Sequence, residues 1–307
     1  MATDHLCVCW VGFLWFLVRL VVLPDRHKSM TGKQTYSFWL EPNDGSASRN
    51  LMYASKKGMT NKTTYLISLD KDDMGKSYND RSKWYLGKLQ SKGRDTNKFY
   101  VYDRGMNAED LMLMERGSSS RQGGGVGLRQ SAARRELAVV AYNRGSHFSH
   151  SRRIEVGLPA IVRDDGTTVT EAQFRPFTDA DSLMTVFENI RTKGQHNVVA
   201  CKRILALHNK AWSAGKTSEL SQFGGRATES STKNFQLCVS PPSDTAFRKQ
   251  FEAGVMGQRE KIHPERVVLQ MGRCVDRFNV DFTYPMSFFS AFALCLSRFA
   301  TKATDAF

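Results

Sequence analysis

The chain has 307 residues, of which 41% are hydrophobic and 24% are charged, with 44 Lys and Arg against 30 Asp and Glu. This composition excludes a disordered tail, a collagen, a coiled coil and a many-helix membrane protein. The formal net charge of +14 indicates a polyanionic partner, for which nucleic acid and an anionic membrane surface are the main candidates. The six cysteines include no CxxC pair and are too few for a disulfide scaffold in a chain of this length, which indicates reduced, intracellular thiols.

An apolar stretch covers residues 6–23 and contains a single charged residue, Arg19. No Lys or Arg precedes it and no small-x-small cleavage site follows it, which argues against export. Two interpretations stay open: an ordered strand or a leader foreign to the domain, and a membrane anchor. We therefore separate an apolar leader, residues 1–25, from a domain over residues 26–307.

From residue 35 onward the sequence is typical of an all-β domain. Short segments rich in β-branched and aromatic residues are bounded by Gly, Asp, Asn or Pro, and they predict an antiparallel meander. These segments are residues 35–40, 63–68, 98–102, 136–142, 234–239 and 267–271.

Residues 278–284 show the clearest alternation of apolar and polar side chains. Because neighbouring residues of a strand point to opposite faces, one face is expected to be buried and the other to face water. The buried face is predicted to carry Phe278, Val280, Phe282 and Tyr284. The wet face is predicted to carry Asn279, Asp281 and Thr283.

Two insertions and two helices complete the pattern. Residues 104–131 and 241–264 predict long surface loops, and residues 179–192 predict a helix that packs on the core. Residues 285–299 are apolar around nearly the whole helical circumference but too short to span a bilayer, which needs about 20 residues. An enclosed helix at the end of an all-β chain predicts a β-barrel closed around it.

Several motifs make the chain similar to the tubby family. Residues 223–236 (FGGRATESSTKNFQ) resemble its first signature, and residues 268–285 and 291–299 resemble its penultimate stretch and its terminal helix. Four shorter matches occur in the family's order at residues 65–68, 86–89, 98–103 and 134–138. The resemblance implies a mainly β fold: a closed, twelve-stranded antiparallel barrel around a hydrophobic C-terminal helix.

The resemblance also implies a function without catalysis. Tubby-like domains bind phosphoinositides, typically phosphatidylinositol 4,5-bisphosphate, and tether proteins to the inner plasma membrane or deliver membrane cargo to cilia. We expect a cytoplasmic monomer at the periphery of that membrane, with anchoring by residues 6–23 as the alternative. Cargo delivery to cilia is not expected of this chain alone, since about 25 residues precede the domain.

The pocket that the family implies is carried over residue by residue. Lys88 matches a pocket lysine, whereas Gln90, two positions on and therefore on the same strand face, replaces an arginine. Because Gln90 brings no charge and no bidentate fork, weaker phosphate binding is expected. The other expected headgroup contacts are Arg134, Thr64, Lys92, Lys56, Lys57 and Lys62.

No enzymatic activity, metal or cofactor is expected. The segment Gly215-Lys216-Thr217 lacks the first glycine of a P-loop, and His147 and His150 have no companion ligand at metal spacing. Two other functions stay open: a protein-interaction scaffold whose lipid site has decayed, and a DNA-binding, transcription-linked protein. The arrangement of the cations separates these functions, since one concave cluster suits a headgroup and a broad stripe suits DNA.

Overall fold

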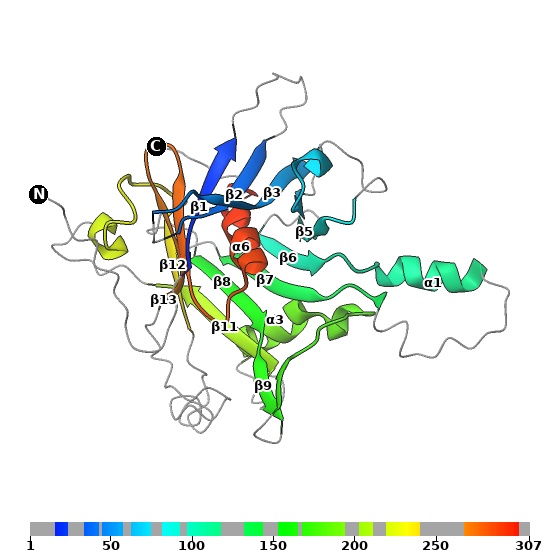
Figure 1. Ribbon diagram of the computed structural model, residues 1–307. Helices are drawn as coiled ribbons and strands as arrows, with labels where there is room; N and C mark the ends of the chain where they lie inside the picture. The colour runs from blue at the N-terminus through cyan, green and yellow to red at the C-terminus, as the bar shows by residue number, and fades with distance from the viewer. Residues whose placement is uncertain are drawn as a thin grey trace, which may run out of the picture.

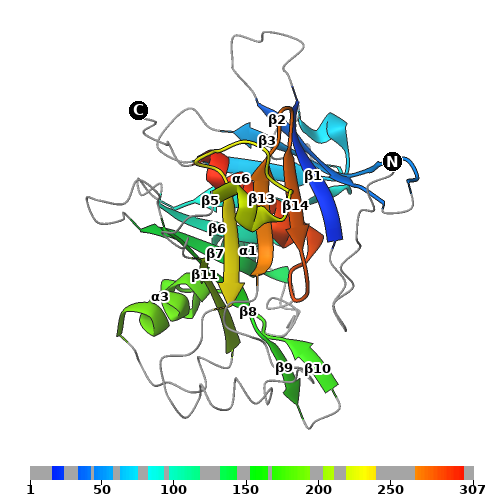
Figure 2. The same ribbon diagram turned by 90° about the vertical axis from the view of Figure 1, so that its left-hand side faces the viewer.

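The computed structural model describes residues 16–23, 34–42, 45–57, 63–74, 82–92, 97–117, 132–143, 153–164, 168–193, 203–210, 219–239 and 267–300. Within them one antiparallel sheet surrounds a helix (Figures 1 and 2). Its strands are β1 (Phe16–Leu23), β2 (Thr35–Leu40), β3 (Arg49–Lys57), β4 (Thr64–Ser68), β5 (Tyr85–Ser91), β6 (Lys98–Asp103), β7 (Glu136–Asn143), β8 (Arg153–Pro159), β11 (Ile204–Asn209), β12 (Phe235–Val239), β13 (Val267–Arg273) and β14 (Phe278–Phe282).

The remaining elements are not part of this sheet, and one of them, the C-terminal helix, is the helix that it surrounds (Figure 1). The α-helices are α1 (Ala108–Gly117), α3 (Leu183–Lys193) and α6 (Phe288–Ala300), and short 3-10 turns are η1 (Lys71–Met74), η2 (Asp179–Asp181) and η3 (Glu219–Phe223). Strands β9 (Ile161–Asp164) and β10 (Thr168–Glu171) form a separate hairpin that extends away from the sheet in Figure 2.

The sheet is an antiparallel meander, as predicted. Strands β2 to β8 follow one another around it, β8 pairs with β11, and β11 to β14 continue the order. The apolar stretch, for which two interpretations stayed open, contributes β1. This strand pairs with β14 on one side and with β2 on the other. The predicted mainly β class is therefore confirmed, and residues 16–23 belong to the sheet. Residues 6–15 lie outside the described residues.

The C-terminal helix α6 is enclosed, as its all-round apolar sequence predicts. Five consecutive residues from Phe292 to Leu296 are fully buried. The ring of Phe292 stacks on that of Phe38 in β2, with 4.8 Å between the ring centroids. Deep in this interface the Ser297 hydroxyl of α6 lies 2.7 Å from the Tyr142 hydroxyl of β7. The two buried hydroxyls therefore satisfy each other and link α6 to β7.

A second apolar layer forms on the outer face of β6 and β7. There α3 buries Phe187 against Val139, and Gly157 in β8 lets the helix approach closely, since a Cβ at that position would lie 2.9 Å from the Phe187 ring. The predicted helix over residues 179–192 thus corresponds to η2 followed by α3 and packs on the core as expected.

Glu136 at the start of β7 ties this layer to the sheet. Its Oε2 accepts hydrogen bonds from the Leu183 N–H, at 2.6 Å, and from the Ser182 hydroxyl, at 3.1 Å. The carboxylate therefore caps the N-terminus of α3, where a negative charge is stabilised. Burial nevertheless raises the pKa of Glu136, because these hydrogen bonds only partly offset the loss of water.

This pKa predicts a pH dependence of stability. The folded state holds the Glu136 proton to a higher pH than the unfolded chain, whose glutamates titrate near 4.3. The stability that protonation of Glu136 contributes is fully present below the unfolded-state pKa. It is lost as the pH rises through the folded-state pKa. We expect the unfolding free energy of the native chain to fall relative to that of Glu136→Gln as pH rises from 4 toward 7, in urea titrations at each pH. Parallel curves for the two proteins would contradict the assignment.

Three sequence predictions are wrong in the described residues. The predicted loop over residues 104–131 contains helix α1, since Ala108, Leu111 and Met114 lie among good helix formers. Tyr284 lies beyond the end of β14 and is 45% exposed rather than buried. The predicted wet face of β14 is buried, with Asp281 only 2% exposed. The predicted loop over residues 241–264 lies outside the described residues.

The outer face of β14 is buried because the segment after η3 crosses it. The Arg226 guanidinium donates to both carboxylate oxygens of Asp281 at 2.7 to 3.0 Å, and Gln270 Nε2 donates to the same carboxylate at 2.7 Å. Asn279 Nδ2 donates to the Arg226 carbonyl oxygen at 3.0 Å. Gly272 makes room for the segment, since a Cβ there would lie 2.7 Å from that of Ala227. The first signature motif therefore packs across the outer face of β14 and is hydrogen-bonded to it.

Candidate functional site

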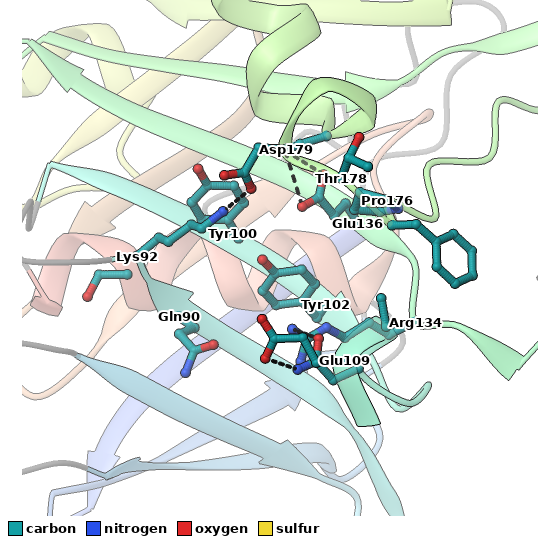
Figure 3. A pocket seen from close by; sticks show the side chains of 15 residues that line it. Gln90, Lys92, Tyr100, Tyr102, Glu109, Arg134, Glu136, Pro176, Thr178 and Asp179 are labelled. Carbon is teal, nitrogen blue, oxygen red and sulfur yellow. Dashed lines mark hydrogen bonds and ion pairs between the residues drawn. The ribbon is translucent and has the colours of Figure 1, made fainter. Parts of the chain in front are cut away.

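A polar cavity of about 270 Å³ opens on the outer face of β5, β6 and β7, beside the start of α1 and the turn η2 (Figure 3). Of the predicted headgroup contacts, Gln90, Lys92 and Arg134 line it. They come from the end of β5 and the residues just before β7, so the strand order brings together positions more than 40 residues apart in sequence. The sheet thus brings three of the eight predicted residues to one cavity.

Two parallel tyrosines form the floor on which the cations lie. The rings of Tyr100 and Tyr102, two residues apart on β6, stack with centroids 6.0 Å apart. The Arg134 guanidinium lies 4.3 Å and Lys88 Nζ 5.7 Å from the Tyr102 centroid, and Lys92 Nζ lies 5.9 Å from that of Tyr100. Cation–π attraction of about 0.5–1 kcal/mol each holds these side chains near one another.

The tyrosines were not among the predicted site residues. Alternation along β6 places Tyr100 and Tyr102 on the face opposite the buried Phe99 and Val101, so the sequence contained the signal. Burial, and next the nearby Glu136 carboxylate, raise the pKa of Tyr102 above its usual range. The ring therefore stays a neutral phenol at physiological pH.

Lys88 and Gln90 share the outer face of β5, as predicted, but their surroundings differ. Lys88 is only 8% exposed and is not among the cavity-lining residues, although it contacts the cavity floor through Tyr102. Gln90 lines the cavity, and its Nε2 donates to the Thr64 hydroxyl at 3.0 Å across the β4–β5 pair. Thr64 therefore positions Gln90 from behind instead of lining the cavity.

Glycine at position 87 is needed for this geometry. Its backbone lies so close to β6 that a Cβ would be 2.1 Å from the Tyr102 carbonyl oxygen and 2.9 Å from the Phe289 ring. A backbone oxygen in a paired strand cannot move aside, so any larger residue would push β5 away from the floor. Gly87 thus sets the distance between Lys88 and Tyr102.

The basic cluster predicted on β3 does not line the cavity. Lys56 and Lys57 pair in the sheet with Tyr65 and Thr64, and Lys57 Nζ donates to the Met74 carbonyl oxygen at 2.7 Å. Strand β4 separates them from β5, the nearest strand of the cavity. Lys62 lies outside the described residues.

Carboxylates share the cavity with the cations. Asp179 of η2 forms an ion pair with Lys92, Glu109 of α1 lies at the rim, and Glu136 points toward the α3 N-terminus (Figure 3). The Lys92–Asp179 pair is largely exposed, so solvent screening leaves it worth at most about 1 kcal/mol. An anionic ligand can therefore displace Asp179 from Lys92 at small cost. These acidic residues were not among the predicted site residues.

The described residues hold no cluster of His, Cys, Asp and Glu that could bind a metal ion. Among the same residues, no helix combines the length and apolarity that a membrane crossing needs. Burial raises the pKa of the Cys295 thiol, so this cysteine stays protonated inside the core.

The architecture defines an all-β domain built around one helix, with a polar cavity on its outer face. The Tub family profile matches residues 17–301, and the chain belongs to that family, as its motifs predicted. It is similar to human Tubby-related protein 3 (30% identity over 294 residues, 93% of this chain and 54% of that protein). It is also similar to rice Tubby-like F-box protein 6, with 32% identity over 295 residues, and to Protein king tubby 1 of Aedes aegypti, with 30% over 254 residues. These alignments cover 88% and 81% of this chain, and 66% and 48% of the relatives. The chain thus spans about half to two thirds of these proteins' length.

Proposed function

We propose that the domain binds phosphoinositide headgroups, of the phosphatidylinositol 4,5-bisphosphate type, in the outer-face cavity and so tethers the protein to anionic membrane. The observation that carries this proposal is that Lys92 and Arg134 line one cavity and lie, with the neighbouring Lys88, over the two stacked tyrosines of its floor. A concave cluster of cations suits a compact polyanion, whereas a nucleic acid needs an extended basic stripe.

Each residue has a distinct part in this proposal. Arg134 offers a planar fork for bidentate phosphate contact, and its Nη2 donates to Asn107 Oδ1 at 3.1 Å. Lys88 and Lys92 act as point charges, and Gln90 supplies a neutral donor. Lys56 and Lys57, outside the cavity, contribute long-range attraction of about 1 kcal/mol each close to an anionic surface.

The fold contributes rigidity to the proposed site. With β1 paired to both β14 and β2, we infer that the twelve strands close into a barrel around α6. Closure would fix β5 and β6 relative to β7, so that the cations need little reordering on binding. The proposed location is the cytoplasmic leaflet of the plasma membrane. The proposed role is binding, with no chemical step.

The test is titration of the full chain with soluble inositol 1,4,5-trisphosphate by calorimetry. Arg134→Ala removes a charge-assisted contact of about 1.5–3 kcal/mol and is expected to weaken binding roughly 10- to 100-fold. Gln90→Arg adds a fork at the same cavity and is expected to strengthen binding by a similar factor.

Arg203→Ala is the matched control, because this guanidinium lies 4.7 Å from the Phe174 ring and outside the cavity. Its binding constant should equal that of the native chain. No binding by either the native chain or Gln90→Arg would reject the headgroup site, and the scaffold function would then fit the three carboxylates of the cavity better.

A further inference from the structure

Helix α1 starts at the cavity and leads away from the sheet (Figure 1). Asn107, Ala108 and Glu109 line the cavity, so its first turn forms part of the rim. Its base is fixed to the segment just before β7 that carries Arg134, since the Arg134 N–H donates to the Met106 carbonyl oxygen at 2.9 Å. The direction of α1 is therefore set by the same residues that form the headgroup cavity.

Beyond its first turn, α1 exposes large apolar side chains. Met112 is 45% exposed, and Leu113 and Met114 are each 62% exposed. Consecutive residues of a helix point in directions about 100° apart, so the three side chains spread over about 200° of the circumference of α1 and no single face of the sheet could cover them. Of the seven exposed large apolar residues in the described part of the chain, these three are the only consecutive ones.

We propose that α1 inserts Met112, Leu113 and Met114 into the interfacial region of the lipid bilayer whose headgroup occupies the cavity. This inference rests on the proposed function and adds a hydrophobic contact to it. A ten-residue helix is about 15 Å long, enough to reach the acyl boundary about 5–10 Å below the headgroups but too short to cross. The acidic Glu109 and Asp110 lie on the cavity side of the apolar residues, at the level of the headgroups.

Continuity with the cavity selects a membrane over a protein partner as the occupant. A headgroup held beside Arg134 places the bilayer surface at the rim, where α1 begins, so the exposed residues face lipid without any rearrangement. Met and Leu side chains that leave water for the acyl boundary each strengthen binding by roughly tenfold. The cavity would give headgroup selectivity, and α1 would give residence time.

The first arm of the test separates insertion from headgroup recognition. Leu113→Ser combined with Met114→Ser is measured in the full chain, on phosphatidylcholine vesicles containing phosphatidylinositol 4,5-bisphosphate and on soluble inositol 1,4,5-trisphosphate. We expect vesicle binding at least about tenfold weaker, with unchanged trisphosphate binding. Val275→Ser is the control, because Val275 is 79% exposed in the β13–β14 turn. Strands β12, β11 and β8 separate this turn from the cavity strand β7. Unchanged vesicle binding by the double variant would overturn the inference.

The second arm reads insertion directly and does not need trisphosphate binding. Leu113→Trp and Val275→Trp are compared for fluorescence quenching by brominated acyl chains in the same vesicles. Additional quenching in Leu113→Trp alone supports insertion, even if the headgroup site itself fails, whereas equal quenching in both variants overturns it. A native dimer that becomes a monomer in the Leu113→Ser, Met114→Ser variant would assign the patch to self-association and would also overturn it.

Discussion

Removal of residues 1–23 is expected to abolish cooperative folding of the domain. Strand β1 pairs with β14 from Phe16 to Leu20 and with β2 from Val18 to Leu23, so its deletion leaves unpaired backbone along both neighbours. The gap would also open the sheet beside α6, where Phe38 and Val280 are fully buried. Exposed strand edges and an exposed apolar helix together leave too little burial to offset chain entropy.

Deletion of residues 1–15 is the matched control, since it stops before the first paired residue of β1. Urea denaturation followed by far-ultraviolet circular dichroism should give a cooperative transition for this control and a broad or absent one for the longer deletion. Equal midpoints and slopes for the two proteins would show that β1 is dispensable.

Arg226→Ala is expected to cost about 3–5 kcal/mol of unfolding free energy. The substitution leaves the Asp281 carboxylate, 2% exposed, without its cationic partner while the strand still holds it away from water. Arg226→Lys should recover only part of this loss, because a lysine cannot donate to both carboxylate oxygens in fork geometry.

The control for this prediction is Arg273→Ala. Arg273 also forms an ion pair, with Glu229 at 2.7 Å, but both side chains are more than one third exposed. Such a pair contributes at most about 1 kcal/mol, so the midpoint of urea unfolding should shift little. A similarly small shift for Arg226→Ala would mean that the contact of the signature segment with β14 does not stabilise the domain.

Much of the fold could be predicted because its signals are local. The all-round apolar run of α6 predicts its enclosure, and β2 follows its predicted range, 35–40, to the residue. Strand β8 was missed because Gly157 and Pro159 interrupt its pattern, and β3 and β11 were missed as well. The burial of Asp281 could not be predicted, since Arg226 reaches it from 55 residues away.

The site was predicted only in part, for a related reason. Lys88, Gln90 and Arg134 came from the family motifs, and the structure places them around one tyrosine floor. Asp179 comes from a turn in the outer layer. Glu109 comes from helix α1, which was predicted as part of a loop because a Gly-rich run follows it. Alternation gives the face of a strand, but it does not tell which distant segment packs on that face.

The most direct test of the headgroup site is co-sedimentation of the full chain with two kinds of vesicle of equal total charge. One contains phosphatidylinositol 4,5-bisphosphate and the other phosphatidylserine, and each is measured with the native chain and with Arg134→Ala. The proposed function predicts preferential binding to the phosphoinositide vesicles that Arg134→Ala removes. Equal binding to both vesicles, unaffected by Arg134→Ala, would contradict it and leave only diffuse attraction between a chain of net charge +14 and any anionic surface, membrane or nucleic acid.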